Sequence, residues 1–583
     1  MPTPAESRVP SSGNPPSHEP RNPRRVLLRI ALFGLPFVLL YGLNARTVLI
    51  GDSQAHLYLA ASMAWSGDAD LCEFRTQLVE AGGGQLPYFA IEERGPVRSI
   101  FNFFPAVLLA PFFWLFGIMG GEAFRGSLDA WGLTGKFVAT LFVFAAGVPL
   151  WGLLRHRVRP SVAVLALAGF WIGTPLWPAS VDYLQHNPMV FFKLGALWAL
   201  FGGSSAEARR PRFFLGGLAL ALSVLCRYQT LPSAAVLALL VFVRHLRTPG
   251  LWRFLLGGML PAPFAFAYHF LVFGAPLALG PNPWLRFDQP LLGTSFALLF
   301  NPSKGLAVHS PWIALGIGML AWRTLRGLRW THALRLPGVA FFSSVPTFLL
   351  YAKLNGWFGG WCWGYRYLLD LLPEAVLLAA FGLQLLWWRG VVARGVIAAA
   401  LACSIMVQTI GALCYDTEWH KRHDLGVGPS QAWVWQLRHS QIAYYARRGT
   451  IYLGGMRAEF RPSPFEDRGL YEQEFWGEIP VRWTERRASF LYVARRFPAG
   501  LVMFPHPETG DSDVLRVMVR LNDRPPYEVH LVSGQWTFIP LEPLPYQHSA
   551  VVTIEAPSVF TEPGGLRRDL GVALDMRAFA KDQ

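Results

Sequence analysis

The residues best suited to chemistry follow directly after an apolar segment. Gly51 and Asp52 open the polar stretch GDSQAHLYLAASMAWSGDADLC. A carboxylate at this place can act as a general base on a hydroxyl group or ligate a divalent metal, and His56, one helical turn later, can bind substrate. The alternative role for Asp52 is structural, because Asp is a preferred N-cap residue and residues 53–65 have helical spacing.

Further charged side chains stand in the other polar segments between apolar runs. Arginine and lysine can hold a phosphate, with anchoring at a membrane interface as the alternative. Aspartate and histidine can bind substrate, although a lone histidine is more often structural. The substrate-binding candidates in these segments are Arg98, Asp182, His186, Arg227, Lys304 and Arg366. Asp70, in the same stretch as Asp52, is a second candidate metal ligand.

The elements that must position these residues are mostly apolar. Of the 583 residues, 52% are hydrophobic and 15% are charged, whereas about a quarter are charged in a typical soluble protein. Apolar runs recur from residue 26 to residue 414, and a helix needs roughly 20 mostly apolar residues to cross a bilayer. We therefore predict a polytopic α-helical membrane protein.

The net charge of +15 has an explanation other than nucleic-acid binding. The basic residues cluster between the apolar runs, which is the positive-inside pattern of membrane proteins. We therefore expect no nucleic-acid partner. The five cysteines form no CxxC pair, so they predict neither a zinc site nor a disulfide framework.

The basic clusters also predict a topology. Even numbers of apolar runs separate the clusters at 155–159, 209–212, 244–253, 323–335 and 389–394, so all of them can face the cytoplasm. Three runs precede Arg155, and we expect one of them, 100–119 with its two prolines, to be re-entrant or tilted. The predicted outward segments are 46–99, 179–187, 227–230, 274–304 and 355–369. They contain all the candidate residues.

The chain divides into four predicted parts. Residues 1–25, rich in Pro, Ser, Asn and Arg, predict a disordered cytoplasmic tail. Residues 26–414 predict a membrane domain with about 11 to 13 transmembrane helices. Residues 415–480 predict a mixed linker region of loops and short helices, and 481–583 an extracytoplasmic β-sandwich-like domain, because short alternating runs are separated by turn formers. This domain can bind carbohydrate or serve as a lid or spacer.

Five segments resemble the motifs of the GT-C superfamily of integral membrane glycosyltransferases, which includes protein O-mannosyltransferases and lipid A aminoarabinose transferases. They occur in family order across residues 51–375 and read GDSQAHLYLAASMAWSGDADL, RSIFNFFPAVLLAPFF, TPLWPASVDYLQHNPM, NPSKGLAVHSPW and GWFGGWCWGYRYLLDLLP. Two positions depart from the family pattern. Ser53 replaces the second acid of the Asp-Glu pair, which weakens a metal site, and Tyr365 replaces a proline.

The resemblance implies a glycosyltransferase that moves a sugar, with inversion at C1, from a polyprenyl-phosphate donor to a hydroxyl of a lipid, glycan or protein. Asp52 would be the base, and Arg98, Lys304 and Arg366 would stabilise the departing phosphate, with a divalent metal as a possible cofactor. It also implies a multi-pass protein of a bacterial-type inner membrane. Two alternatives stay open: a lipid-linked saccharide transporter or flippase, and an inactive membrane anchor for the C-terminal domain.

Overall fold

The computed structural model describes residues 23–44, 46–81, 85–92, 95–203, 211–274, 286–327, 335–417, 419–420, 435–448, 450–453, 456–459, 468–470, 474–476, 479–493, 500–505, 514–521, 525–541, 549–557, 560–561 and 569–575. The predicted tail 1–25 lies almost wholly outside these residues. Helices occupy the described chain up to residue 448, apart from one short hairpin, and strands occupy the rest.

The apolar runs fold into helices, as predicted. Within the described ranges, five helices are long and apolar enough to cross a membrane: Phe104–Arg125, Leu128–Leu154, Trp252–Leu271, Tyr367–Trp387 and Val391–Cys414. The helices before the first basic loop are α1 (Pro23–Gly42), α2 (Gly51–Trp65), α3 (Arg75–Ala81), α4 (Phe104–Arg125) and α5 (Leu128–Leu154). Those up to the loop after residue 245 are α6 (Pro160–Ile172), α7 (Leu176–Ala179), α8 (His186–Phe201), α9 (Phe213–Cys226) and α10 (Leu231–His245).

The second half of the helical part contains the most enclosed of the five candidate spans. Its helices are α11 (Trp252–Met259), α12 (Ala262–Phe273), α13 (Leu291–Phe300), α14 (Leu306–His309), α15 (Pro311–Leu325), α16 (Arg335–Lys353), α17 (Leu372–Trp387), α18 (Val391–Cys414) and α20 (Gln441–Arg448). The span formed by α17 and the preceding 3-10 turn Tyr367–Leu371 is the most enclosed of the five, with 89% of its apolar window buried. Because that turn begins one residue after Arg366, the buried helix fixes the position of this arginine.

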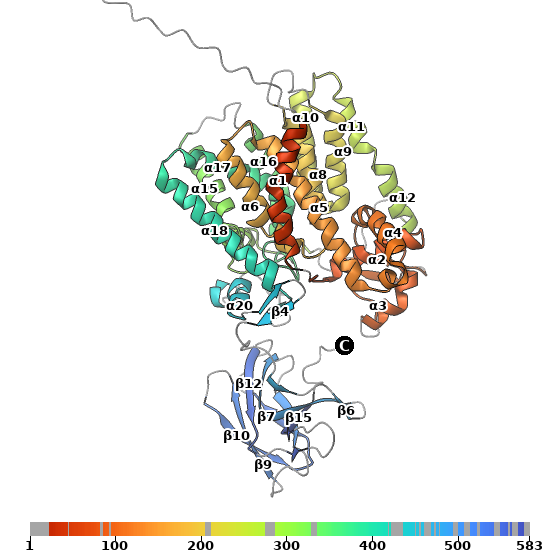
Figure 1. The fold of residues 1–583 in the computed structure, drawn as a ribbon, viewed down its shortest axis with the longest axis vertical. Coiled ribbons are helices and arrows are strands. Elements are labelled where there is room, and N and C mark those ends of the chain that lie inside the picture. Colours follow the sequence, from red (N-terminus) through yellow and green to blue (C-terminus); the bar gives the residue numbers. More distant parts are fainter. Residues whose placement is uncertain are drawn as a thin grey trace, which may run out of the picture.

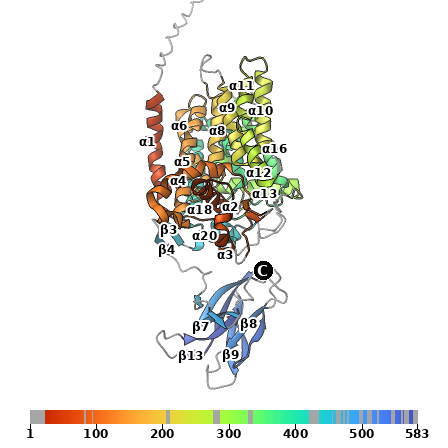
Figure 2. The same cartoon turned by 90° about the vertical axis from the view of Figure 1, so that its right-hand side faces the viewer.

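The two ends of the helical part differ in content (Figures 1 and 2). Helices α2, α3 and α4 gather at the end from which the β-sheet part extends. The start of α11, which follows a basic loop, lies at the opposite end. Helix α4, which contains residues 104–119 of the predicted run 100–119, packs against α2 and α5, and Gly121 with its positive φ of 54° kinks the helix near its end. The loop before α11 and helix α2 therefore lie at opposite ends of the helical part.

The C-terminal part is an antiparallel sheet, which agrees with the predicted strands. The strand order is β10-β9-β12-β7-β15-β8-β11, with β5 and β6 also pairing with β7. Strand β7 pairs with β15 through residues 481–483 and with β12 through 487–493, so it joins two halves of one sheet. A strand shared in this way turns a corner between packed sheet layers. Its strands are β5 (Arg468–Leu470), β6 (Glu474–Trp476), β7 (Ile479–Val493), β8 (Gly500–Pro505), β9 (Val514–Leu521), β10 (Tyr527–Val532), β11 (Thr537–Pro540), β12 (Ser549–Glu555) and β15 (Val572–Asp575).

Three smaller hairpins complete the fold. They are β1 (Ala90–Glu92) with β2 (Val97–Ser99), β3 (Thr450–Leu453) with β4 (Met456–Glu459), and β13 (Phe560–Thr561) with β14 (Asp569–Leu570). The second hairpin links the end of the helical part to the segment before α2, because the Arg46 guanidinium lies 3.8 Å from the centre of the Tyr452 ring. Asp416, just after α18, accepts hydrogen bonds from Arg448 and Tyr452 at the same place.

Candidate active site

The centre of the site is an ion pair between residues 314 positions apart in the sequence. Arg366 donates through Nη2 to Oδ2 of Asp52, and Tyr88 donates to Oδ1 at 2.6 Å. The Asp52 side chain is 14% exposed and that of Arg366 is 6% exposed, so the pair lies at the edge of solvent. Burial on its own raises the pKa of the Asp52 carboxyl, but the charge of Arg366 and the bonds from Tyr88 and Arg366 outweigh it, and the pKa lies below its ordinary value.

Asp52 is positioned by helix α2, whose first turn is held by another carboxylate. The N-cap residue is Ile50, and Asp52 stands inside the first turn rather than at the cap. Oδ2 of Asp182 accepts from the backbone N–H of Ile50 at 3.1 Å and from the Ser53 hydroxyl. Asp182 thus holds the start of α2 through the N–H of the N-cap residue and the Ser53 hydroxyl, and Asp52 does not act as the N-cap.

The glycine before Asp52 makes room for its tyrosine partner. A Cβ atom at position 51 would lie 2.5 Å from the Tyr88 ring, which is closer than carbon atoms pack. The ring is 58% exposed and closes over the start of α2 from the segment before β1. Gly51 therefore allows the hydroxyl of Tyr88 to reach Asp52.

Arg366 is held by a loop of left-handed glycines. Gly359, Gly360 and Gly364 have φ angles of 77°, 70° and 62°, which residues with a side chain rarely adopt. The carbonyl oxygen of Gly359 lies 3.5 Å from Nη1 of Arg366. Nε of Arg366 is buried and has no hydrogen-bond partner within the described chain. The guanidinium therefore has donors that its present contacts do not use.

A second ion pair lies behind the first. Arg227 donates through Nε to Oδ2 of Asp370 at 2.6 Å, and the Tyr351 hydroxyl donates to the same oxygen. The guanidinium of Arg227 lies 5.4 Å from the centre of the Tyr367 ring, which stacks on Tyr351 with centroids 4.8 Å apart. Asp370, Tyr351 and Tyr367 thus contact the Arg227 side chain, which is buried.

A third pair lies one turn further along α17. Lys193 of α8 is 2.7 Å from Glu374 and donates to the backbone oxygen of Asp370 at 2.8 Å. The sequence analysis missed Lys193, Asp370 and Glu374, because they lie within runs that read as apolar. A charged residue inside a membrane helix is energetically costly and is usually paired. This cost was the signal from which the three residues could have been predicted to pair. For Tyr88 and Tyr351, which donate to Asp52 and Asp370, the residue type gave no signal.

Two candidate histidines line the same region, and their ring nitrogens make no hydrogen bond within the described residues. His56 is fully buried one turn after Asp52, with its ring edge toward Phe101 and Tyr183. His186, at the start of α8, lies 3.6 Å from the free oxygen of Asp370. In the described part of the chain no group hydrogen-bonds to either ring. Burial lowers the pKa of His56 to about 4, against the opposing effect of Asp52, so its ring is neutral at pH 7.

Lys304 supports the loop that carries Arg366. Its ammonium group is buried and donates to the carbonyl oxygens of Cys362 at 2.6 Å and Gly360 at 3.4 Å. His420 and Gln441 also reach the Cys362 oxygen, at 3.2 and 2.9 Å. Burial lowers the pKa of Lys304 to about 8, in spite of the nearby Cys362. The ammonium of Lys304 is thus directed at the backbone of the loop that carries Arg366, and its contact with a phosphate stays a prediction.

The remaining two candidates are Arg98 and Asp70. Arg98 stands in β2 opposite Ile91, and its charge acts on Tyr268 of α12. Asp70 belongs to an acidic group with Asp68 and Glu73, whose oxygens lie within 4.8 Å of one another. In the described ranges this is the group that could hold a cation, and Asp52 is not part of it. The structure therefore does not bring Asp52 and Asp70 together around one metal.

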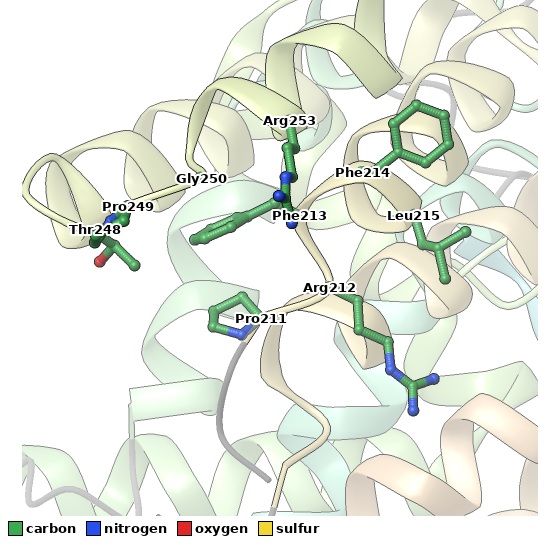
Figure 3. A pocket seen from close by; sticks show the side chains of 9 residues that line it. All are labelled: Pro211, Arg212, Phe213, Phe214, Leu215, Thr248, Pro249, Gly250 and Arg253. Carbon is green, nitrogen blue, oxygen red and sulfur yellow. The ribbon is translucent and has the colours of Figure 1, made fainter. Parts of the chain in front are cut away.

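A pocket of about 530 Å³ lies elsewhere, between the starts of α9 and α11 (Figure 3). Arg212 and Arg253 line it together with Phe213 and the turn before α11. Helix α9 has 14 residues and is therefore about 20 Å long. Since Arg212 precedes its first residue and Arg227 follows its last, this pocket belongs to the basic end and not to the Asp52 site.

Comparisons with known proteins give only a distant likeness. No family model matches the chain, and no curated protein matches it. The chain is similar to a solved archaeal oligosaccharyltransferase, AglB from Archaeoglobus fulgidus in complex with an inhibitory peptide and a dolichol-phosphate, at 12% identity and a TM-score of 0.39, over 76% of this chain and 61% of that one. It is also similar to an Archaeoglobus fulgidus oligosaccharyltransferase in complex with Zn and sulfate, at 13% identity and a TM-score of 0.37, over 76% and 59%. The chain thus spans about three fifths of the length of these structures, and the likeness is too distant to assign an activity.

Proposed function

We propose that the protein is a membrane glycosyltransferase that moves a sugar from a polyprenyl-phosphate donor to a hydroxyl acceptor. The observation that carries the proposal is the pair of Asp52 and Arg366, a carboxylate and a guanidinium joined at the edge of solvent by parts of the chain 314 residues apart. Sugar transfer from a lipid phosphate needs these two groups side by side. One takes a proton from the acceptor, and the other stabilises the departing phosphate.

In the proposed reaction Asp52 accepts the proton of the acceptor hydroxyl. The acceptor oxygen forms a bond to C1 of the sugar, and the bond from C1 to the phosphate oxygen breaks. The lipid phosphate leaves with the electron pair, and its new negative charge is stabilised by Arg366. Arg227 lies behind Arg366 and adds positive potential, since its charge also acts on Asp52. Attack opposite the leaving phosphate inverts C1.

The surroundings suit a lipid donor that approaches along the helices. The membrane-length helix α4 packs against α2, and the span Tyr367–Trp387 begins one residue after Arg366, so the lipid chain would lie against these helices. His56 and His186 are buried, their ring nitrogens make no hydrogen bond within the described residues, and they would contact the donor or acceptor. The site would face the extracytoplasmic side of the membrane, since the basic loops lie at the opposite end. The acceptor would be a lipid, glycan or protein hydroxyl.

The test is sugar transfer in membranes that contain the full chain or its Asp52→Asn variant. Asparagine keeps the shape of the side chain but cannot take the proton, so turnover should fall at least about a hundredfold. The matched control is Asp70→Asn, which removes a nearby carboxylate outside the site and should leave turnover unchanged. Full transfer by Asp52→Asn would exclude this mechanism and would favour a transporter, which does not need a base.

A further inference from the structure

The carboxylate proposed as the base is not available in the resting site. Both oxygens of Asp52 already accept, one from Tyr88 at 2.6 Å and the other from Arg366. The ion pair compensates the charge of the carboxylate, and a charge-compensated carboxylate attracts a proton weakly. Asp52 can become an effective base only when Arg366 turns to another anion.

Arg366 has the donors to bind another anion. An arginine has five N–H donors in a planar fork that matches carboxylate and phosphate. Nη2 of Arg366 is used by Asp52, Nη1 reaches the Gly359 oxygen only at 3.5 Å, and Nε is buried without a partner in the described chain. A normal N–H to oxygen bond is about 2.9 Å. Asp52 is thus the one strong partner of the guanidinium, and a phosphate that binds Nη2 must displace it.

The neighbouring arginine cannot take over this role. Arg227 is 2% exposed and is bound to Asp370 at 2.6 Å, in contact with Tyr351. Its counter-charge is fixed, so it stays behind the site as a permanent positive charge. Of the two arginines, Arg366 is the one that can exchange its carboxylate for another anion.

We propose that the donor phosphate competes with Asp52 for Arg366, so that donor binding itself releases the base. This inference rests on the proposed function, and it adds an order of events. Without donor, Asp52 stays locked in the ion pair. With donor, the guanidinium is bound to phosphate, and the buried carboxylate is left with a higher proton affinity. The acceptor is then deprotonated only when a sugar is in place.

Affinity for a lipid phosphate tests the competition without any transfer of sugar. Farnesyl phosphate would be titrated by calorimetry into the purified full chain and three variants: Asp52→Asn, Arg366→Gln and the double variant. Asp52→Asn should bind farnesyl phosphate about tenfold more tightly, because Arg366 no longer has to leave a carboxylate. Arg366→Gln should bind at least about tenfold more weakly. The double variant should bind as Arg366→Gln does.

The double variant separates competition from simple repulsion. If Asp52 only repelled the phosphate, its removal would tighten binding equally with and without Arg366. Equal tightening in both backgrounds, or no tightening in either, overturns the inference. Asp70→Asn is the matched control, since it removes a carboxylate of the separate acidic group and leaves Arg366 paired with Asp52, and its affinity should not change. Should Asp52→Asn fail to fold, Asp52→Ser serves for the same comparison.

Failure of the competition differs from failure of the proposed function. If Asp52→Asn abolishes transfer but does not change the affinity for farnesyl phosphate, the enzyme assignment stands and the competition is wrong. If Asp52→Asn still transfers sugar, the proposed function is wrong.

Discussion

Replacing Asp370 by Asn should destabilise the protein strongly, because it leaves a buried charge without a partner. Asp370 has no exposed surface, and Arg227 is 2% exposed. Asp370 binds Arg227 at 2.6 Å and also accepts the hydroxyl of Tyr351. Removing one partner of such a pair costs about 3–5 kcal/mol, since the remaining charge stays away from water.

The double variant Arg227→Gln/Asp370→Asn should recover most of that loss. It removes both charges, so neither side chain is left as an unpaired buried charge, which is the main cost of the single variant. The assay is thermal unfolding of the purified full chain in detergent, followed by the fluorescence of its 23 tryptophans. Two results would contradict this role of the pair: Asp370→Asn unfolding at the same temperature as the wild type, or the double variant unfolding at as low a temperature as Asp370→Asn.

Three further outcomes follow from the same geometry. Burial raises the pKa of Asp182 to about 7 in spite of its hydrogen bonds. Because the charged form of Asp182 holds the start of α2, the rate of sugar transfer should fall as the pH drops below about 7. The variant Asp182→Asn should no longer show this fall. Gly51→Ala should displace the Tyr88 ring and lower kcat/KM about as much as Tyr88→Phe, roughly two- to tenfold, and kinetics of the double variant should show no further loss. Asp70→Asn should keep its rate within about twofold at all concentrations of added Mg²⁺ or Mn²⁺, because Asp52 is not in that acidic group.

The sequence predicts the elements of this fold well where one physical signal dominates. Apolar runs become helices because a bilayer accepts few other structures. The alternating segments after residue 480 become β7 to β12, since a half-buried strand needs a repeat of two. The predicted helix over 53–65 is confirmed as α2. Boundaries shift where proline intervenes, as at Pro261, which separates α11 from α12.

The sequence predicts the members of the site less completely than its location. Asp52 and Arg366 are found because each is a charge at the end of an apolar run. Their direct contact cannot be read from spacing, since it depends on how α2 and the loop before α17 pack. Asp182 was expected to contact substrate, and the structure shows its carboxylate accepting from α2. Its type and position were informative, but the partner of a loop carboxylate depends on the tertiary fold.

The three ion pairs differ in exposure, and this difference assigns them different roles. The side chains of Lys193 and Glu374 are 1% and 0% exposed, and those of the middle pair, Arg227 and Asp370, are 2% and 0%. Arg366 and Asp52 reach 6% and 14%. An anion from outside can approach only a pair that water also reaches, whereas a deeper pair would have to lose its partner in a medium that opposes free charge. Only the pair of Arg366 and Asp52 can therefore exchange its carboxylate for an external anion. The two deeper pairs instead hold together the helices on which their own residues lie.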